Sequence, residues 1–291
     1  MASIAITGAN GRLGRALRAD PRWRDNALQP CLRTADAELG AISVESLADP
    51  GVMGRFDAVL HLAWGVVPTT AEANPRQVHE IELPLLDRLS KSATEAQTHL
   101  LFVSTGAVYG NSERETGSIE TDELNPVGEY ARGKAAAETL IQERNEQAAI
   151  LRVANVYGVP GTAGPPQGVI PRIIQAALEG TVFEQWGVDS EKDYIHIDDL
   201  SRALLATIDQ RISGIYNVCS GRTLRLSEMI ALVENLTNRR IEVRAKEGEL
   251  SWDVTRNRLD PSKFTAASGW KPEVELEDGV SRLVQEIGAS A

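Results

Sequence analysis

The hydrophobic residues of this chain fall into short apolar runs that alternate with longer segments of helical spacing. The apolar runs, which predict strands, are Ser3–Thr7, Leu28–Arg33, Ala58–Ala63, Leu100–Ser104, Ala148–Val153 and Tyr194–Ile197. The segments with helical spacing are Arg12–Arg18, Gln77–Ser92 and Glu129–Arg144. This alternation predicts an α/β fold of the doubly wound type, with a parallel sheet that helices cover on both faces.

An interruption of this regular alternation predicts that the chain has two parts of unequal size. A loop rich in Pro and Gly lies between Tyr157 and Gln167, and the pattern is less regular from Gly221 onward. We expect residues 1–157 to form a dinucleotide-binding domain, to which residues 193–220 return. Residues 158–192 and 221–291 are expected to form a smaller C-terminal lobe that binds the substrate.

Composition and charge narrow the classes of partner. The chain has 42% hydrophobic and 24% charged residues, which is typical of a globular protein with a large core. A net charge of −11 disfavours nucleic acid, because such binding needs Lys and Arg spread along phosphates. Cys31 and Cys219 have neither CxxC nor metal-ligand spacing, so we expect small buried hydrophobic residues in a reducing compartment. Without a basic leader or an apolar run of membrane-spanning length, we expect a cytoplasmic protein with no membrane partner.

A glycine-rich turn follows the first predicted strand. In the stretch Thr7–Gly14, glycines stand at positions 8, 11 and 14, directly before a helix. Gly8 suits the tight turn, Gly11 lets the backbone approach a pyrophosphate, and Gly14 permits close helix–strand packing. The spacing differs by one residue from the common form, and a turn without any ligand is the alternative.

Two further segments carry hydroxyl and ammonium groups. Tyr130 and Lys134 are four residues apart on a predicted helix and therefore project from the same face. A nearby cation would lower the pKa of the phenol toward the range of a general acid or base. Ser104 and Thr105 end an apolar strand, at the sheet edge where doubly wound folds bind ligands. A solvated helix face and a simple loop cap are the alternatives for these two segments.

The glycine turn, the Ser-Thr strand end and the Tyr/Lys helix occur in an order that resembles the extended short-chain dehydrogenase/reductase family. Within it, the chain looks like the branch of nucleotide-sugar epimerases, dehydratases and 4-ketoreductases. Further matching segments are Val59–Ala63, Leu151–Gly158, Asp193–Leu200, Tyr216–Gly221 and Gly269–Pro272. The resemblance covers nearly the whole chain and implies an NAD(P)-dependent enzyme with this two-part fold.

The resemblance also implies roles for particular residues. Tyr130 would be the general acid/base, Lys134 its cationic and ribose-binding partner, and Thr105 the hydroxyl that positions the reacting oxygen. The residues implied in cofactor binding are Gly8, Gly11, Arg12, Leu13, Gly14, Arg33, Leu62, Ala63, Trp64, Tyr130, Lys134 and Val153. Those implied in substrate binding are Ser104, Asn155, Lys192 and Arg256. The segment with His196 and Asp198–Asp199 is expected to pack structurally and to hold no metal.

Five positions depart from the family pattern. Lys192 stands where many relatives have Arg, and lysine lacks the two-pronged guanidinium. Trp64 replaces a small residue beside the expected nicotinamide cleft, and Glu82 replaces an Asn that is frequent on the fourth helix. Gly106 and Ala107 occupy the positions where sugar dehydratases carry an Asp-Glu pair, which disfavours dehydration.

The end of the second strand bears on the cofactor. An NAD site normally has an acid there, about 20 residues past the glycines, to bind the ribose hydroxyls. This strand ends with Arg33, and Asp36 falls in the following loop. Arg33 and Arg12 are suited to a 2′-phosphate, so we expect NADP(H), with NAD as the alternative.

The resulting expectation is 4-keto reduction of a nucleotide-diphosphate sugar. A 4-epimerase that retains NAD is the first alternative, and a non-catalytic dinucleotide-binding regulator is the second. The presence of Thr105, Tyr130 and Lys134 together favours an enzyme. The family's habit of pairing its fourth and fifth helices and the small residues Ala135–Ala137 further suggest a homodimer.

Overall fold

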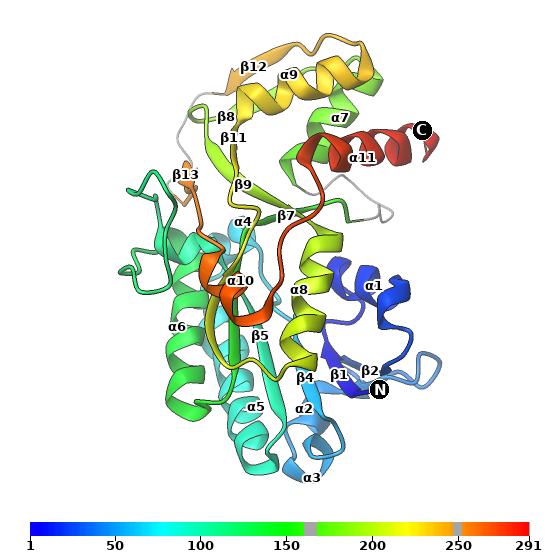
Figure 1. Ribbon diagram of the computed structural model, residues 1–291, viewed down its shortest axis with the longest axis vertical. Helices are drawn as coiled ribbons and strands as arrows, with labels where there is room; N and C mark the ends of the chain where they lie inside the picture. The colour runs from blue at the N-terminus through cyan, green and yellow to red at the C-terminus, as the bar shows by residue number, and fades with distance from the viewer. Residues whose placement is uncertain (160–167, 247–251, 291) are drawn as a thin grey trace.

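A parallel sheet forms the centre of the molecule (Figure 1). The computed structural model describes residues 1–159, 168–246 and 252–290. Within these residues the sheet has seven strands in the order β3-β2-β1-β4-β5-β6-β10, and all neighbours are parallel. The strands are β1 (Ser3–Thr7), β2 (Ala27–Leu32), β3 (Ile42–Ser43), β4 (Ala58–His61), β5 (His99–Thr105), β6 (Ala149–Val153) and β10 (Gly214–Val218). This is the doubly wound fold that the sequence predicts, with the reversal of strand order between β1 and β4.

Helices cover both faces of this sheet because successive strand residues point to opposite sides. Ile4 and Ile6 pack with Leu17 and Leu200 on one face, whereas Ala5 packs with the core of the other. The helices of the first face are α1 (Arg12–Ala19), α8 (Ile197–Asp209) and α10 (Ser262–Ser268). Those of the second are α2 (Val44–Leu47), α3 (Pro50–Met53), α5 (Leu83–Ala96) and α6 (Gly128–Arg144). The large apolar area buried on both faces is the main stabilising term of the fold.

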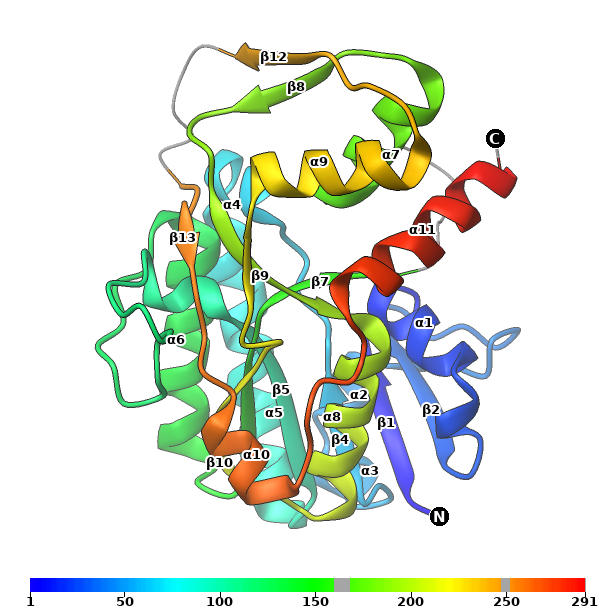
Figure 2. The same cartoon turned by 45° about the horizontal axis from the view of Figure 1, so that its top comes forward.

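A second group of elements lies at one end of the sheet (Figure 2). Its helices are α7 (Val169–Glu179), α9 (Leu226–Thr237) and α11 (Leu276–Ser290), which share a separate apolar core. Its strands are β7 (Asn155–Tyr157), β8 (Phe183–Trp186), β9 (Glu191–His196), β11 (Thr223–Arg225), β12 (Val243–Lys246) and β13 (Arg256–Asn257). Strand β9 pairs with β7, β11 and β13, and β12 pairs with β8.

The position of β9 corrects one expectation. The apolar run Tyr194–Ile197 does include strand residues, but they belong to this second sheet and not to the central one. A buried apolar run predicts a strand without indicating which neighbour it will pair with. The following residues do return to the central sheet, through α8 and β10.

Short helical turns complete the framework. The expected helix over Gln77–Ser92 is a π-helical turn, η2 (Val78–Glu82), that continues into α5. The remaining short elements are η1 (Pro21–Trp23), η3 (Gly106–Tyr109) and α4 (Pro68–Ala73).

Both Cys31 and Cys219 are buried as free thiols, and burial raises the pKa of Cys31 to about 12. Among the described helices, none combines the length and the apolar character needed to cross a bilayer.

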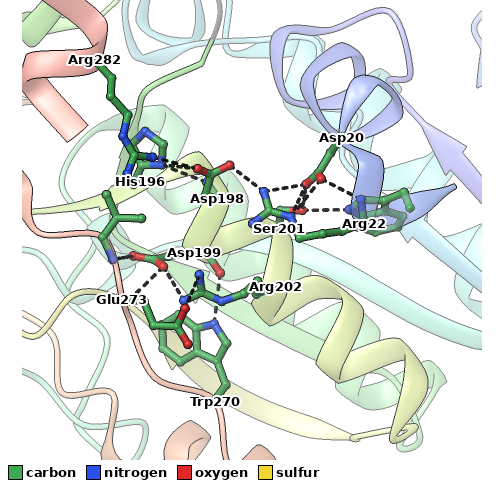
Figure 3. Close-up of polar contacts among 12 residues, drawn as sticks. Asp20, Arg22, His196, Asp198, Asp199, Ser201, Arg202, Trp270, Glu273 and Arg282 are labelled. Atoms are coloured by element: carbon green, nitrogen blue, oxygen red, sulfur yellow. Dashed lines mark hydrogen bonds and ion pairs between the residues drawn. The ribbon is translucent and has the colours of Figure 1, made fainter. Parts of the chain in front are cut away.

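The acidic start of α8 fixes the C-terminal segment to the rest of the chain (Figure 3). Asp198 accepts a hydrogen bond from Arg22 at 2.6 Å and lies 3.5 Å from Arg282 of α11. Asp199 is buried and accepts from Arg202 at 2.6 Å and from the backbone N–H of Glu273 at 3.0 Å. Arginines and backbone amides therefore serve as partners for this acidic segment.

Candidate active site

A cleft of about 860 Å³ opens at the carboxyl ends of β1, β4, β5 and β6, below α7 and β8. Most of the residues singled out from the sequence line it. They are Gly8, Gly11, Arg12, Leu13, Gly14, Leu62, Trp64, Ser104, Thr105, Tyr130, Lys134, Val153, Asn155 and Lys192. Ligands of doubly wound folds bind at this edge of the sheet, beside the reversal of strand order. The structure thus gathers residues that are far apart in the sequence into one concave surface.

The glycine turn is shaped by close backbone contacts. Gly8 has a φ of +69°, and a Cβ added there would lie 2.9 Å from the backbone nitrogen of Ala63. A Cβ at Gly14 would lie 2.7 Å from the Cα of Ala9, so both positions require glycine. No side chain caps the start of α1 at Gly11, whose own N–H donates to the carbonyl of Gly8 at 2.8 Å, and the N-terminus of a helix attracts an anion. This arrangement fits the pyrophosphate of a dinucleotide.

Two buried side chains behind the turn hold β1 and β4 together, and the sequence pattern did not single them out. The Thr7 hydroxyl lies 2.9 Å from Nδ1 of His61 and accepts a hydrogen bond from Ala63 N–H at 3.2 Å. Burial, together with the charge of Lys134, lowers the pKa of His61 to about 3. His61 is therefore neutral and serves to position the strand end that carries Leu62 and Ala63.

The end of β5 brings two hydroxyl-bearing residues, Ser104 and Thr105, to the cleft in different settings. Thr105 is half-buried, and its Oγ1 accepts from the N–H of Ala107 at 3.2 Å. Ser104 is buried and donates its hydroxyl to the carboxylate of Glu138 on α6. Ser104 thus donates its hydroxyl hydrogen to Glu138, whereas Thr105 does not.

Lys134 is buried on α6 and reaches the same strand. Its Nζ donates to the carbonyl oxygen of Val103 at 2.8 Å. Burial lowers the pKa of Lys134 to about 7, although the carboxylates of Glu138 and Glu82 oppose this shift. The ammonium group is thus poised to lose or hold its proton near neutral pH.

Tyr130 is half-buried on the same face of α6, one turn before Lys134. The structure differs here from the expectation that Lys134 would lower its pKa. Burial instead raises the pKa of Tyr130 to about 12, because the phenolate is poorly solvated in the cleft wall. Tyr130 is accordingly a protonated phenol at neutral pH.

A buried ion pair lies behind these residues and was missed in the sequence. Arg152 of β6 donates to Oε2 of Glu138 from Nε at 2.9 Å and from Nη2 at 2.7 Å. Its Nη1 donates to the hydroxyl of Tyr109 at 2.8 Å. Glu138 follows Lys134 by one helical turn, so the spacing alone could have placed it on the inward face. The pair ties α6 to β6 directly beneath the cleft.

The other end of the cleft combines cations with carboxylates. Lys192 forms an ion pair with Asp253 at 2.7 Å, and both line the cleft. Asn155 donates through Nδ2 to the carbonyl of Asp193 at 2.9 Å. Arg172 lies over the ring of Phe183, 5.6 Å from its centroid. Arg256, which the sequence suggested here, is exposed on β13 and does not line the cleft.

The two arginines expected at the cofactor ribose occupy different settings. Arg12 lines the cleft. Burial, and to a smaller extent the charge of Arg15, lowers the pKa of Arg12. Arg33 follows β2, is 68% exposed, and has Nη2 3.5 Å from Oε1 of the buried Glu82. Asp36 lies in the loop, where its carboxylate accepts from the N–H of Glu38 at 3.0 Å. An acid is therefore absent from the final residue of β2 and the residue after it.

Comparison with known proteins places these features in context. Residues 4–219 match the model of the NAD dependent epimerase/dehydratase family. The chain is 29% identical over 195 residues to the dTDP-4-dehydro-6-deoxyglucose reductase of Escherichia coli, covering 65% of this chain and 61% of that protein. The chain thus spans about three fifths of the length of that relative.

Two further likenesses extend over nearly the whole chain. The GDP-6-deoxy-D-mannose reductase of Pseudomonas aeruginosa is 24% identical, with 97% of this chain and 96% of that protein covered. The UDP-glucose 4-epimerase of Thermus thermophilus, solved with NAD, has a TM-score of 0.83 at 24% identity and covers 99% of this chain and 100% of that chain. This structural likeness shows that the fold is shared.

Proposed function

This chain belongs to the NAD dependent epimerase/dehydratase family, and we propose that it reduces the 4-keto group of a nucleotide-diphosphate sugar. The observation that carries the proposal is that Thr105, Tyr130 and Lys134 line the same cleft as the glycine turn. A hydroxyl, a phenol and an ammonium group are thereby brought beside a surface that fits a dinucleotide. The two reductases among its relatives support this reaction.

The residues of the cleft suit the reduction of a ketone. When bound, the reduced nicotinamide would supply a hydride to the carbonyl carbon. Tyr130 would donate its proton to the carbonyl oxygen, which completes the new hydroxyl group. Lys134 would stabilise the phenolate that remains, and Thr105 would hold the reacting oxygen by a hydrogen bond.

Elimination of water is disfavoured by the residues at the end of β5. Gly106 and Ala107 carry no acid, and a Cβ at position 106 would lie 2.6 Å from Cδ1 of Leu259. An aspartate at that position would require Leu259 to move. The cleft therefore favours hydride transfer alone, as in a reductase or an epimerase, over dehydration.

For the cofactor we propose NADP(H). Arg33 stands at the end of β2 where an NAD site would carry an acid, and Arg12 lines the cleft at the glycine turn. The carboxylate of Asp36 binds its own loop instead. A reductase that consumes NADPH releases the oxidised cofactor after each turnover, whereas an epimerase retains NAD throughout its cycle.

Turnover distinguishes the reductase from the epimerase. The purified protein is supplied with dTDP- or GDP-linked 4-keto-6-deoxyhexoses and NADPH or NADH, and the absorbance at the nicotinamide band is followed. A reductase oxidises NADPH in proportion to the sugar. If the protein instead carries tightly bound NAD and interconverts UDP-glucose and UDP-galactose without net oxidation, the epimerase replaces this proposal. Binding of the dinucleotide without turnover of any of these sugars would favour a regulator.

The assembly and location of the protein remain predictions. We infer a homodimer through α5 and α6 from family habit and from the small residues of α6. Ala137 lies in the core, Ala135 is half-buried, and Ala136 is exposed on the outer face. Light scattering that gives a monomer at all concentrations would exclude this interface. A cytoplasmic location is likewise inferred from the sequence alone.

A further inference from the structure

The ammonium group of Lys134 is buried and lies close to two aromatic rings. One hydrogen bond, to the carbonyl of Val103, is formed by its Nζ at 2.8 Å. The ring of Trp64 lies 4.3 Å from Nζ and the ring of Phe102 lies 4.4 Å from it, each measured to the ring centroid. An ammonium group this close to two ring faces is attracted by their negative electrostatic potential.

The two rings also contact each other and hold a defined geometry. Their centroids are 6.0 Å apart with an angle of 63° between the planes. Phe102 belongs to β5 and is fully buried, so its ring is fixed by the core of the sheet. Trp64 follows β4, and its ring therefore depends on its neighbours for orientation.

Packing, and not a hydrogen bond, orients the ring of Trp64. Within the described part of the chain, its buried Nε1 has no hydrogen-bond partner. The ring fits against Gly133, where an added Cβ would lie 3.3 Å from Cζ2 of Trp64 and 2.5 Å from Cγ1 of Val78. A buried N–H without a partner destabilises a fold, so other contacts of this ring must offset that cost in free energy. The contact of the Trp64 ring with Lys134 is one stabilising contact of this kind.

We infer that Trp64 and Phe102 form an aromatic clamp that holds Lys134 as an ammonium ion beside the Val103 carbonyl, which makes Trp64 a positioning residue of the site. The clamp offsets part of the cost of burying the cation. What Lys134 does during turnover rests on the proposed function, but the clamp itself can be tested in the protein without ligands.

Other charged and titratable groups face Lys134 and set the background for this effect. Glu138 on α6 and Glu82 on η2 favour the ammonium, whereas burial opposes it more strongly. His61 on β4 is neutral at working pH, and Tyr130 on α6 is a neutral phenol. The balance leaves the pKa of Lys134 at about 7, where a modest change in stabilisation alters the charged fraction.

The test measures the titration of Lys134 directly. The chain has six lysines, so protein labelled with ¹³C at the lysine Cε gives a simple NMR spectrum, and Lys134→Met identifies the signal. Trp64→Leu keeps apolar bulk but removes the ring face. We expect it to lower the pKa of Lys134 by about 0.4 to 1.5 pH units, the range that a cation–π contact supports. Phe102→Leu should act in the same direction.

Two more variants keep the test decisive. Trp64→Phe retains a smaller ring and should lower the pKa less than Trp64→Leu does, and it covers the case that the leucine variant does not fold. Trp186→Leu is the matched control, because Trp186 lies under a different lysine, Lys246, whose Nζ is 4.2 Å from the ring centroid. It should leave the Lys134 signal unchanged.

The outcomes separate the clamp from the proposed function. An unchanged Lys134 pKa in the folded Trp64 and Phe102 variants, or an equal shift in Trp186→Leu, would overturn the clamp. A shift confined to the Trp64 and Phe102 variants supports it, even if no keto sugar is ever turned over. In that case the clamp stands and the proposed reaction fails.

Discussion

Nζ of Lys134 lies 2.8 Å from the carbonyl oxygen of Val103, so helix α6 is bonded to the strand whose end carries Thr105. This contact and the hydrogen bond from the Ser104 hydroxyl to Glu138 join the two elements that hold the hydroxyl, phenol and ammonium groups. The ion pair of Glu138 and Arg152 ties α6 to the neighbouring strand β6. The site is therefore built on a helix and a strand whose relative position leaves little freedom.

Replacing Tyr130 by Phe should remove the proton donor while keeping the ring. We expect kcat to fall by about two to four orders of magnitude, the usual weight of general acid–base catalysis, with cofactor affinity nearly unchanged. Steady-state kinetics and fluorescence titration with NADPH measure the two quantities. Near-normal turnover in this variant would remove Tyr130 from the mechanism.

The lowered pKa of Lys134 predicts how stability depends on pH. Its pKa is about 7 in the folded protein, against an ordinary value of 10.5. Between these values the unfolded chain binds more protons, so the contribution of Lys134 to the free energy of unfolding becomes more favourable as pH rises. Lys134→Met lacks this term. Urea unfolding at pH 7 and pH 9.5 should therefore show the wild type gaining stability relative to the variant. An equal difference at both pH values would contradict the lowered pKa.

We expect Arg33 to bind the 2′-phosphate of NADPH. If it binds this group, Arg33→Ala lowers the ratio of kcat/KM for NADPH to that for NADH by about ten- to a hundredfold, as loss of a charge-assisted hydrogen bond would. Arg24→Ala, which removes another arginine that does not line the cleft, is the matched control. An unaltered preference for NADPH in Arg33→Ala would mean that another residue recognises the phosphate.

The buried pair of Glu138 and Arg152 should be strongly coupled. Glu138→Leu leaves the guanidinium of Arg152 buried without its carboxylate, and we expect a loss of about 3–5 kcal/mol in the free energy of unfolding. Adding Arg152→Met should recover much of it, because the unpaired charge is then gone. Additive losses in a double-mutant cycle from denaturant unfolding would show that the two residues act independently.

The sequence predicted the central sheet because strands and turns follow from short-range patterns, and most of the residues that it singled out line one cleft. Alternating apolar runs indicate strands such as β1 and β5, and glycines with fixed spacing indicate the turn at Gly8. The contacts missed in the sequence depend on distant partners. The pairing of β9 with the second sheet and the hydrogen bond between Thr7 and His61 are examples.

The pKa of Tyr130 shows where local spacing gave a wrong expectation, because burial raises this pKa and the nearby Lys134 does not lower it. The four-residue separation from Lys134 correctly placed both groups on one face of α6. It could not reveal that Nζ would point to Val103 and the rings of Trp64 and Phe102, or that burial would dominate the phenol. Desolvation depends on the surrounding tertiary structure, which no single helix encodes.

The central claim is that hydride passes to a sugar ring carbon while Tyr130 supplies the proton. The most direct measurement uses NADPH that carries deuterium at both hydrogen positions of nicotinamide C4, together with a 4-keto-6-deoxyhexose nucleotide, and locates the label by NMR and mass spectrometry. The account predicts one deuterium at C4 of the reduced sugar with wild-type protein, and labelling that is slower by about two to four orders of magnitude with Tyr130→Phe under the same conditions. A product without deuterium, or equal labelling by the variant, would contradict it.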